Sequence, residues 1–294
     1  MTARVRHWFP VALIAVGTAA IGARAQKAPA LPDLLKAAGD YVLQYSQRLG
    51  AVAAEEEYMQ FDTSSGQMGV PKRIYAEIVW LGGGNGTTGG FRDVFAIDRQ
   101  PVRQRDDRLL TLFKAPSASS ISEAQNLTDG AVHYYISSNL HALDQPMLAL
   151  EFLRKENQER STFKLEGLKT MNGAQVAIVK FNERNTPRLV PSGENGPGVG
   201  RFWIDAATGA VRQTELGIVS RTDNIRVSVK YALEPTLDLW LPVEMTQNVD
   251  ASGRGSGGTN NMGGGGGYGA HQALEGHANY SKFRQVPVDL GKLK

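Results

Sequence analysis

The chain has 294 residues, of which 41% are hydrophobic and 21% are charged, and it contains no cysteine. A chain of this length and apolar content can bury a large hydrophobic core. The absence of cysteine excludes disulfide bonds, thiolate metal ligands and a cysteine nucleophile, so the core must supply the stability of the fold.

The first 25 residues have the pattern of a secretory signal peptide. Arg4 and Arg6 precede an apolar segment from Trp8 to Ile21, and Ala23-Arg24-Ala25 forms a small-x-small cleavage site. The apolar segment is short for a membrane span, and a retained anchor is the alternative. No later segment is long and apolar enough to cross a bilayer. We therefore expect a periplasmic or secreted protein whose mature residues, 26–294, form a single domain.

Export changes the charge of the chain. The full sequence has 32 Lys and Arg residues against 29 Asp and Glu residues, and its pI is near 9.0. Arg4, Arg6 and Arg24 lie in the predicted signal peptide, which has no acidic residue, so the mature chain carries 29 charges of each sign. This balance gives no support for nucleic-acid binding through bulk charge.

An amphipathic helix is predicted to open the mature domain. Pro32 and Asp33 are typical of a helix start, and Gly50 is typical of a helix end. The apolar residues between them repeat at helical spacing: Leu34, Leu35, Ala38, Tyr41, Val42, Tyr45 and Leu49. This stripe indicates packing against the core of the domain, and a partner-binding helix is the alternative.

From Ala51 the periodicity changes to two, which is typical of a strand. One face would then carry Ala54, Glu56, Tyr58 and Gln60, and the other would carry Glu55, Glu57, Met59 and Phe61. Continuation of the preceding helix through Glu57 is the alternative. The run of three glutamates indicates a solvated sheet edge, because charge runs usually mark exposed surface. Paired carboxylates for acid–base catalysis are the alternative, although the sequence fixes no histidine or second acid beside them.

Glycines join the next two predicted strands, Arg73–Leu81 and Phe91–Ile97, into a hairpin. The connecting segment, Gly82–Gly90, contains the letters of a dinucleotide-binding fingerprint at Gly84–Gly89. That fingerprint has a physical meaning only where its last glycine opens a helix. Because a strand is predicted to follow, nucleotide binding is rejected.

The middle of the chain is predicted to form two or three short helices, within residues 106–113, 121–136 and 144–155. Pro116, Gly130 and Pro146 mark their boundaries. Since these helices interrupt a sequence of strands, they indicate a lid or a plug on a sheet.

Strands return in the second half of the chain. Ser161–Leu168 and Gln175–Phe181 are joined through Asn172-Gly173, which is the strongest short hairpin signal. Arg201–Arg212 is the clearest hairpin, with its turn at Ala206–Gly209. The remaining predicted strands are 224–233, 240–249 and 274–288.

The alternation in Asn224–Leu233 indicates a sheet with one apolar and one solvated face. Ile225, Val227, Val229 and Tyr231 point one way, and the polar residues between them point the other way. Residues 251–270 are nearly all Gly, Ser and Asn, so we expect a flexible surface loop there.

No motif for catalysis or metal binding is present. The sequence lacks HExxH, GxSxG and Walker patterns. We expect the histidines of the mature chain, His133, His141, His271 and His277, to lie on the surface or in loops. We therefore expect no metal, no cofactor and no enzymatic activity. An exported hydrolase with an active site built from distant residues is an alternative.

The hairpin Phe202–Gly209 is similar to the Trp-[Ile/Leu]-Asp-x-x-Thr-Gly hairpin of the periplasmic lipoprotein-carrier superfamily, which includes LolA, LolB and RseB. Glu215 and the strand segments Val227–Tyr231 and Leu241–Met245 extend the resemblance over the last third of the chain. It implies an α+β fold with a predominantly antiparallel, incomplete (half) β-barrel of about eleven strands. An N-terminal helix and short inserted helices, acting as lid or plug, would complete it.

The resemblance implies an apolar ligand, such as a lipid or the acyl chain of a lipoprotein. The candidate binding residues on the apolar face are Phe202, Ile204, Val227, Val229, Tyr231 and Met245, with Leu109, Phe113 and Leu148 on the helices above. Alternation alone does not distinguish a ligand cavity from a packed core. A protein-interaction module of the RseB type, with an envelope protein as its partner, is the second hypothesis.

Overall fold

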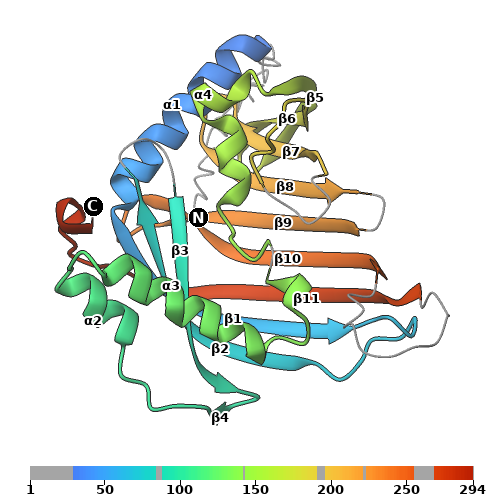
Figure 1. Cartoon of the computed structure of the whole chain (residues 1–294). Coiled ribbons are helices and arrows are strands. Elements are labelled where there is room, and N and C mark those ends of the chain that lie inside the picture. Colours follow the sequence, from blue (N-terminus) through green and yellow to red (C-terminus); the bar gives the residue numbers. More distant parts are fainter. Residues whose placement is uncertain are drawn as a thin grey trace, which may run out of the picture.

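The computed structural model describes residues 29–83, 88–141, 143–190, 196–220, 223–254 and 268–293. The predicted signal peptide, residues 1–25, lies outside these ranges. Within them the chain forms one open antiparallel sheet of eleven strands, with helices packed on both faces (Figure 1). The predicted α+β class and the open sheet with its N-terminal helix are confirmed.

Helix α1 (Leu31–Leu49) forms where the apolar stripe predicts it. Pro32 lies in its first turn, Asp33 adds a favourable negative charge there, and Gly50, at φ 52°, ends it. Its buried residues, which include Leu34, Val42 and Leu49, pack on one face of the sheet. We call this face of the sheet the inner face and the opposite one the outer face.

The strands are β1 (Ala51–Asp62), β2 (Lys72–Gly82), β3 (Thr88–Ile97), β4 (Gln100–Pro101), β5 (Ser161–Met171), β6 (Ala174–Glu183), β7 (Gly198–Asp205), β8 (Val211–Val219), β9 (Asp223–Glu234), β10 (Leu239–Arg254) and β11 (Tyr268–Gln285). Their order is β4-β3-β2-β1-β11-β10-β9-β8-β7-β6-β5. Every neighbour except the pair β1–β11 is adjacent in sequence. The first and last long strands therefore meet inside the sheet, and β4 and β5 form its edges.

The interpretation of residues 55–57 as a solvated sheet edge is wrong. Strand β1 lies between β2 and β11, and Glu56 is 2% exposed. The predicted alternation itself is confirmed, since Ala54, Glu56, Tyr58 and Gln60 are all buried. Glu56 is buried because β11, which is distant in sequence, pairs with β1, whereas Glu55 and Glu57 on the other face are partly exposed.

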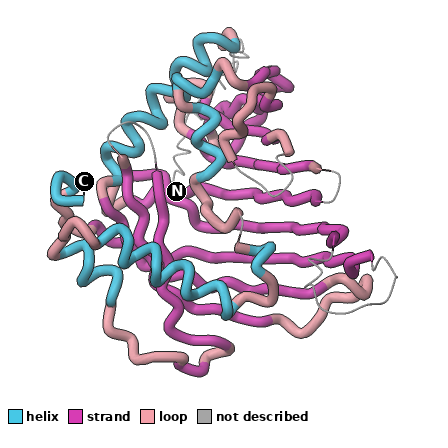
Figure 2. The backbone as a smooth tube through the Cα atoms, viewed as in Figure 1, coloured by secondary structure: helices cyan, strands magenta, loops and turns pink. Residues whose placement is uncertain are grey.

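One helical insertion connects the two edges of the sheet. It contains α2 (Arg108–Lys114), α3 (Ser120–Gly130), η1 (Ala131–Tyr134), η2 (Ser138–Leu140), η3 (Leu148–Leu153) and α4 (Lys155–Gln158). Helix α2 packs on the outer face, α3 lies against β3, and residues 131–158 then cross the inner face towards β5 (Figure 2). We call residues 131–158 the strap.

The helices of the insertion are shorter than the sequence predicts. The pattern in 121–136 ends as an α-helix at Gly130 and continues as the 3₁₀ turn η1. The pattern in 144–155 forms a 3₁₀ helix over Leu148–Leu153, after Pro146. Proline lacks the backbone donor that a longer helix would need.

Two strands extend into the segment predicted as a flexible loop. Strand β10 continues to Arg254 and β11 begins at Tyr268, with Ala251 opposite Gln272. Residues 255–267 lie outside the described part. No helix among the described residues is long and apolar enough to cross a membrane.

Candidate ligand-binding face and its strap

Most of the predicted ligand-binding residues lie together on the inner face. Phe202 and Ile204 on β7, Val227, Val229 and Tyr231 on β9, and Met245 on β10 are all buried in one hydrophobic cluster. Leu148 packs against this cluster from the strap. The inserted segment therefore covers the apolar face at Leu148.

Leu109 and Phe113 lie elsewhere, and their predicted place above the inner face is wrong. Both are on α2 and belong to a second cluster on the outer face, with Val79 and Phe91. Strand β4 is an edge strand, and from there the chain passes to the outer face before α3 brings it to the inner one.

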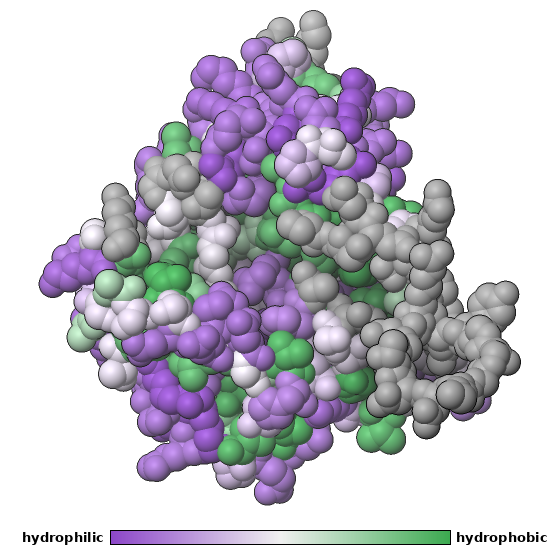
Figure 3. Space-filling view, viewed as in Figure 1, coloured by the Kyte–Doolittle hydropathy of each residue, from purple (hydrophilic) through white to green (hydrophobic). Residues whose placement is uncertain are grey.

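The strap nearly fills the space where it crosses β8 and β9. A cavity of about 10 Å³ remains there, bounded by strap residues that include Leu148 and by Val227 and Val229. Figure 3 shows hydrophobic side chains in a hollow at the centre of this side of the molecule, bordered by hydrophilic residues. The apolar face is thus packed directly beneath the strap.

A buried ionic cluster attaches the strap to the sheet. The Arg92 guanidinium on β3 donates to both carboxylate oxygens of Glu56, at 2.6 and 2.8 Å, and pairs with Asp144 of the strap. The Tyr135 hydroxyl and His141 Nδ1 reach Asp144 Oδ2 at 2.7 and 3.0 Å. Arg92, Glu56 and Asp144 are each at most 2% exposed, so each charge depends on its partners.

The pKa of the Asp144 carboxyl lies below its ordinary value. Burial alone would raise it, but the charge of Arg92 and the hydrogen bonds from His141 and Tyr135 lower it further than burial raises it. Burial raises the pKa of Tyr135 well above its ordinary range, which keeps its hydroxyl as a donor. The strap is therefore held by an ionised carboxylate.

Further polar contacts attach the strap between Tyr135 and Met147. The Tyr231 hydroxyl donates to the Pro146 carbonyl at 2.8 Å, and the Ile136 amide donates to Gln60 Oε1 at 2.8 Å. The next turn, η3, is held differently, because its Leu150, Phe152 and Leu153 are buried in the core. The first half of the strap is thus held by polar groups together with buried apolar side chains such as Leu140 and Leu143, and η3 is held mainly by apolar packing.

Two glutamine amides on the inner face have unused donors. Gln60 Nε2 and Gln247 Nε2 are buried without a hydrogen-bond partner among the described residues, although each Oε1 accepts a bond. Gln60 on β1 and Gln247 on β10 both pair with Gly276 of β11, the strand between them. An unpaired buried donor costs about 1–3 kcal/mol, so these amides would gain from an acceptor.

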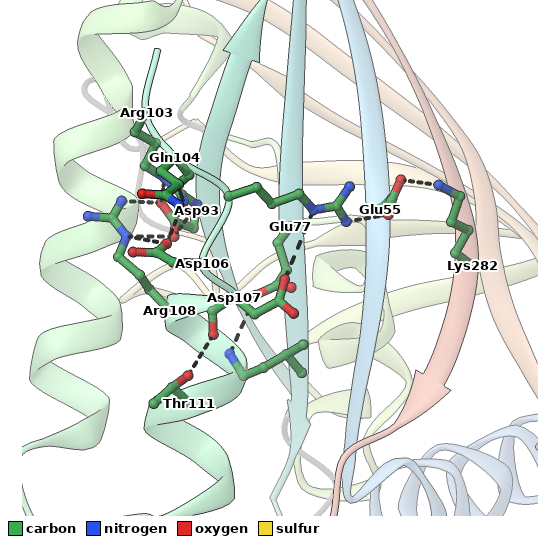
Figure 4. A network of polar contacts seen from close by, with 12 residues as sticks. Glu55, Glu77, Asp93, Arg103, Gln104, Asp106, Asp107, Arg108, Thr111 and Lys282 are labelled. Carbon is green, nitrogen blue, oxygen red and sulfur yellow. Dashed lines mark hydrogen bonds and ion pairs between the residues drawn. The ribbon is translucent and has the colours of Figure 1, made fainter. Parts of the chain in front are cut away.

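A second polar network lies on the outer face and holds α2 and the chain before it (Figure 4). Asp93 is paired with Arg103 and Arg108 at 2.5 Å each. Glu77 accepts from Arg284 at 2.9 Å, but burial and the nearby Asp107 raise its pKa to about 7. Asp93 is therefore neutralised by two arginines, whereas Glu77 lies near both Arg284 and the carboxylate of Asp107.

Two of the four histidines that the sequence analysis expects on the surface or in loops, His141 and His277, contact carboxylates. His277 pairs with Glu275 at 2.7 Å, whereas His141 lies in the buried cluster of the strap. Within the described part of the chain, no serine hydroxyl is hydrogen-bonded to His141, and no group of three metal-binding side chains occurs. No local sequence motif predicts the cluster around His141, because Arg92 and Glu56 lie on β3 and β1, far from the strap in sequence.

No protein-family model matches the chain, and no curated protein matches its sequence. Its structure is similar to an outer-membrane lipoprotein-sorting protein domain from Vibrio parahaemolyticus, with 11% identity and a TM-score of 0.40, covering 87% of this chain and 96% of that one. A LolA superfamily protein from Nitrosomonas europaea shows 9% identity, a TM-score of 0.31, and coverage of 85% and 94%.

MucB, in its complex with MucA(peri), is also similar, with 10% identity, a TM-score of 0.22, and coverage of 89% and 95%. At these TM-scores the likeness concerns the arrangement of elements and identifies no ligand.

Proposed function

We propose that the mature chain, residues 26–294, is an exported, non-enzymatic binding or carrier protein for an apolar ligand such as a lipid or the acyl chain of a lipoprotein. The ligand would bind on the inner face beneath the strap, in the periplasm or outside the cell. One observation carries the proposal: an apolar face is covered by a segment whose first half is fastened by polar contacts.

The energies of the contacts that hold the strap allow a ligand to replace it on the inner face. A buried ion pair contributes little net stability, because desolvation offsets the attraction between the charges. An acyl chain gains about 0.8 kcal/mol for each CH₂ group that it buries. A ligand that buries enough CH₂ groups on the inner face can therefore offset the loss of the polar contacts and of the buried strap side chains Leu140 and Leu143.

The unused donors of Gln60 and Gln247 support the same site. They lie on the inner face, where an ester carbonyl or a carboxylate oxygen would satisfy them. An apolar ligand with such a group fits both the face and its two amides.

Displacement of a fluorescent fatty-acid probe tests the proposal. Tyr231→Phe removes the hydrogen bond to Pro146 and should speed probe uptake several-fold, since losing one buried hydrogen bond costs about 1 kcal/mol. Tyr75→Phe, which removes a hydroxyl that contacts Glu57, is the matched control. Absence of probe binding by the wild-type chain, together with absence of co-purifying lipid in mass spectrometry, would refute the proposal.

A protein partner is the second candidate, and strand β5 is the observation that favours it. This strand has 11 residues, none of them fully buried, and it pairs only with β6 in the described sheet. A free edge of this length can accept a strand from another chain. Hydrogen exchange of β5 should slow in envelope extract if a partner binds there, and an unchanged rate would argue against it.

A further inference from the structure

A cavity of about 500 Å³ lies on the outer face of the sheet, over strands β6 to β10. Helix α2 packs on this face elsewhere, at β2 and β3. The cavity is therefore on the side of the sheet opposite the proposed apolar site, and an inference about it does not depend on the carrier function.

The pairing of the strands brings the side chains around the cavity into two neighbouring rows. One row of directly opposite residues is Lys180, Arg201, Glu215, Ser228 and Thr246. The next row, two residues away on each strand, is Val199, Gly217, Arg226 and Asn248. Residues two apart on a strand share a face, so all these side chains are on the outer side. Leu216 and Val227 also border the cavity, but their side chains belong to the inner cluster, so they contribute the backbone of its floor.

Gly217 leaves a gap in the second row, between Val199 and Arg226. A Cβ on Gly217 would lie 3.4 Å from Val199 Cγ2, and 3.6 and 3.7 Å from the carbonyl oxygens of Val199 and Ile225. These are ordinary van der Waals distances, so the fold would accept a side chain here. Packing therefore does not account for the glycine, whose missing side chain leaves space in the cavity.

Three cations lie side by side at one end of the first row. Lys164 on β5 is directly opposite Lys180, and Lys180 is directly opposite Arg201. Like charges in this arrangement destabilise a sheet. The two carboxylates beside them, Glu166 and Glu215, both pair with Arg201, at 2.7 and 3.5 Å. Neither lysine has an ion pair within the described part of the chain.

Arg226 borders the cavity on the other side of Gly217, and its side chain is exposed. Its Nε donates to Asn224 Oδ1 at 3.3 Å, and its two terminal nitrogens donate to no described residue. They can donate in parallel to two oxygens of one anion. Hydroxyl donors lie beside it, on Ser228 and Thr246. Together with Arg226, the group around Lys180 and Arg201 contains four cations and two carboxylates, a net charge of +2.

We infer that this cavity binds a phosphate group. The hydroxyls and the Asn248 amide can donate or accept, so the charge selects the ligand. Glu215, which is the carboxylate in the lining, is held by Arg201. The charges of Lys180 and Arg226 then match a phosphate monoester, which carries about −1.5 to −2 at neutral pH. The phosphate can belong to a small ester or to a lipid head group.

Amide NMR of the mature chain at physiological ionic strength tests the inference. Methyl phosphate should cause saturable shifts of the Gly217 and Arg226 signals. Its affinity should fall as the pH drops below the second pKa of the phosphate, about 6, because one negative charge is lost. Acetate carries a single charge and should bind more weakly. The absence of a saturable shift, or equal affinities for the two anions at neutral pH, would overturn the inference.

Two charge variants test the named cations. Lys180→Gln and Arg226→Gln should each weaken methyl phosphate binding about tenfold, as expected for one lost hydrogen bond to a charged group. Both side chains are exposed, so the variants should fold. Lys230→Gln is the matched control, because Lys230 is on the same strand and face as Arg226 but pairs with Glu244 outside the cavity. Unchanged binding by both test variants, or an equal loss in the control, would overturn the assignment.

The variants Gly217→Ala and Gly217→Val test the shape of the cavity. Each places methyl groups in the gap of the second row, and valine should weaken methyl phosphate binding more than alanine. Neither should lower the thermal unfolding temperature, because the added Cβ makes ordinary contacts and valine favours strands. Wild-type affinity in both folded variants would contradict this location of the site.

Sedimentation with phosphatidylcholine vesicles, with and without phosphatidic acid, identifies the source of the phosphate. If it is a lipid head group, the vesicles with phosphatidic acid should sediment the wild-type chain more than Arg226→Gln. If it is a small ester, these vesicles should not compete with methyl phosphate. Binding of the fatty-acid probe without any phosphate-induced shift would leave the carrier proposal standing and refute this one.

Discussion

At the residue scale, Arg92 connects three parts of the molecule that are distant in sequence. Its guanidinium, on β3, reaches Glu56 on β1 and Asp144 on the strap. All three charges are buried, so the removal of one leaves the others without a partner in a medium that solvates charge poorly.

Arg92→Met should therefore lower the free energy of unfolding by about 3–5 kcal/mol, as for other broken buried pairs. The triple variant Arg92→Met/Glu56→Gln/Asp144→Asn should lose less than the single one, because no unpaired charge remains. Urea unfolding followed by circular dichroism compares them. A triple variant that is less stable than Arg92→Met would contradict this role of the charges.

Glu77 is a buried carboxyl whose environment opposes ionisation. Burial and the nearby Asp107 raise its pKa from 4.5 to about 7, although Arg284 acts in the other direction. The folded state therefore binds more protons than the unfolded one between these values. The contribution of Glu77 to stability falls as the pH rises from about 4.5 to about 7.

Glu77→Gln should remove this pH dependence. At pH 8 the variant should be more stable than the wild type by roughly 2–3 kcal/mol, and at pH 4 the two should be similar. Thermal unfolding across this range measures the difference. Glu244→Gln, at an exposed ion pair with Lys230, is the control and should change little. An equal pH slope in wild type and Glu77→Gln would contradict the prediction.

At the element scale, the β7–β8 hairpin shows how one side chain organises a turn. Asp205 Oδ1 accepts from the amides of Ala207 and Thr208 at 3.1 Å each, and Oδ2 pairs with Arg212 at 2.6 Å. Burial would raise the pKa of Asp205, but Arg212 and the turn hydrogen bonds lower it. Gly209, at φ 75°, closes the turn against α1.

Asp205→Ala should destabilise the protein by about 2–3 kcal/mol, because two turn amides and Arg212 lose their partner. Asp205→Asn keeps an acceptor and should cost less. The contribution of the carboxylate is present above its unfolded pKa of 3.8 and is lost as the pH falls through its lower folded value. Chemical unfolding at pH 7 and pH 3 should therefore show a smaller penalty at pH 3.

The sequence predicted well those elements whose formation depends on residues close together in the chain. The stripe of α1, the Asn172-Gly173 turn and the alternation in β9 each depend on neighbouring residues. Thr88, after the glycine-rich segment, begins a strand, as predicted from Phe91–Ile97. The predicted helix 144–155 is longer than the observed 3₁₀ helix, Leu148–Leu153, which begins only after Pro146.

The site was less predictable because it depends on pairings across the whole chain. Glu56 lies in a run of three glutamates, which is typical of exposed surface. Only the β1–β11 pairing and the ion pair with Arg92 explain its burial. His141 and Asp144 carry no local motif. Leu109 has the same apolar character as Leu148, but the path of the insertion places the two on opposite faces.

At the scale of the whole molecule, the helical insertion and the open sheet form one connected unit. The sheet is open, and the insertion runs from the edge strand β4 to the edge strand β5. The strap crosses the inner face between them, with polar contacts and buried apolar side chains in its first half and apolar packing in η3. The proposed function requires the first half to leave the face when a ligand enters.

Cross-linking of the strap tests this requirement most directly. Ser137 of the strap contacts Gln272 of β11 at 3.0 Å, and the chain has no cysteine of its own. In a Ser137→Cys/Gln272→Cys variant, a short cleavable bismaleimide can join the two positions, and the single-cysteine variants are the controls. Fatty-acid probe uptake should fall to background when the strap is joined and return after cleavage. Equal uptake by the joined and cleaved proteins would contradict the account.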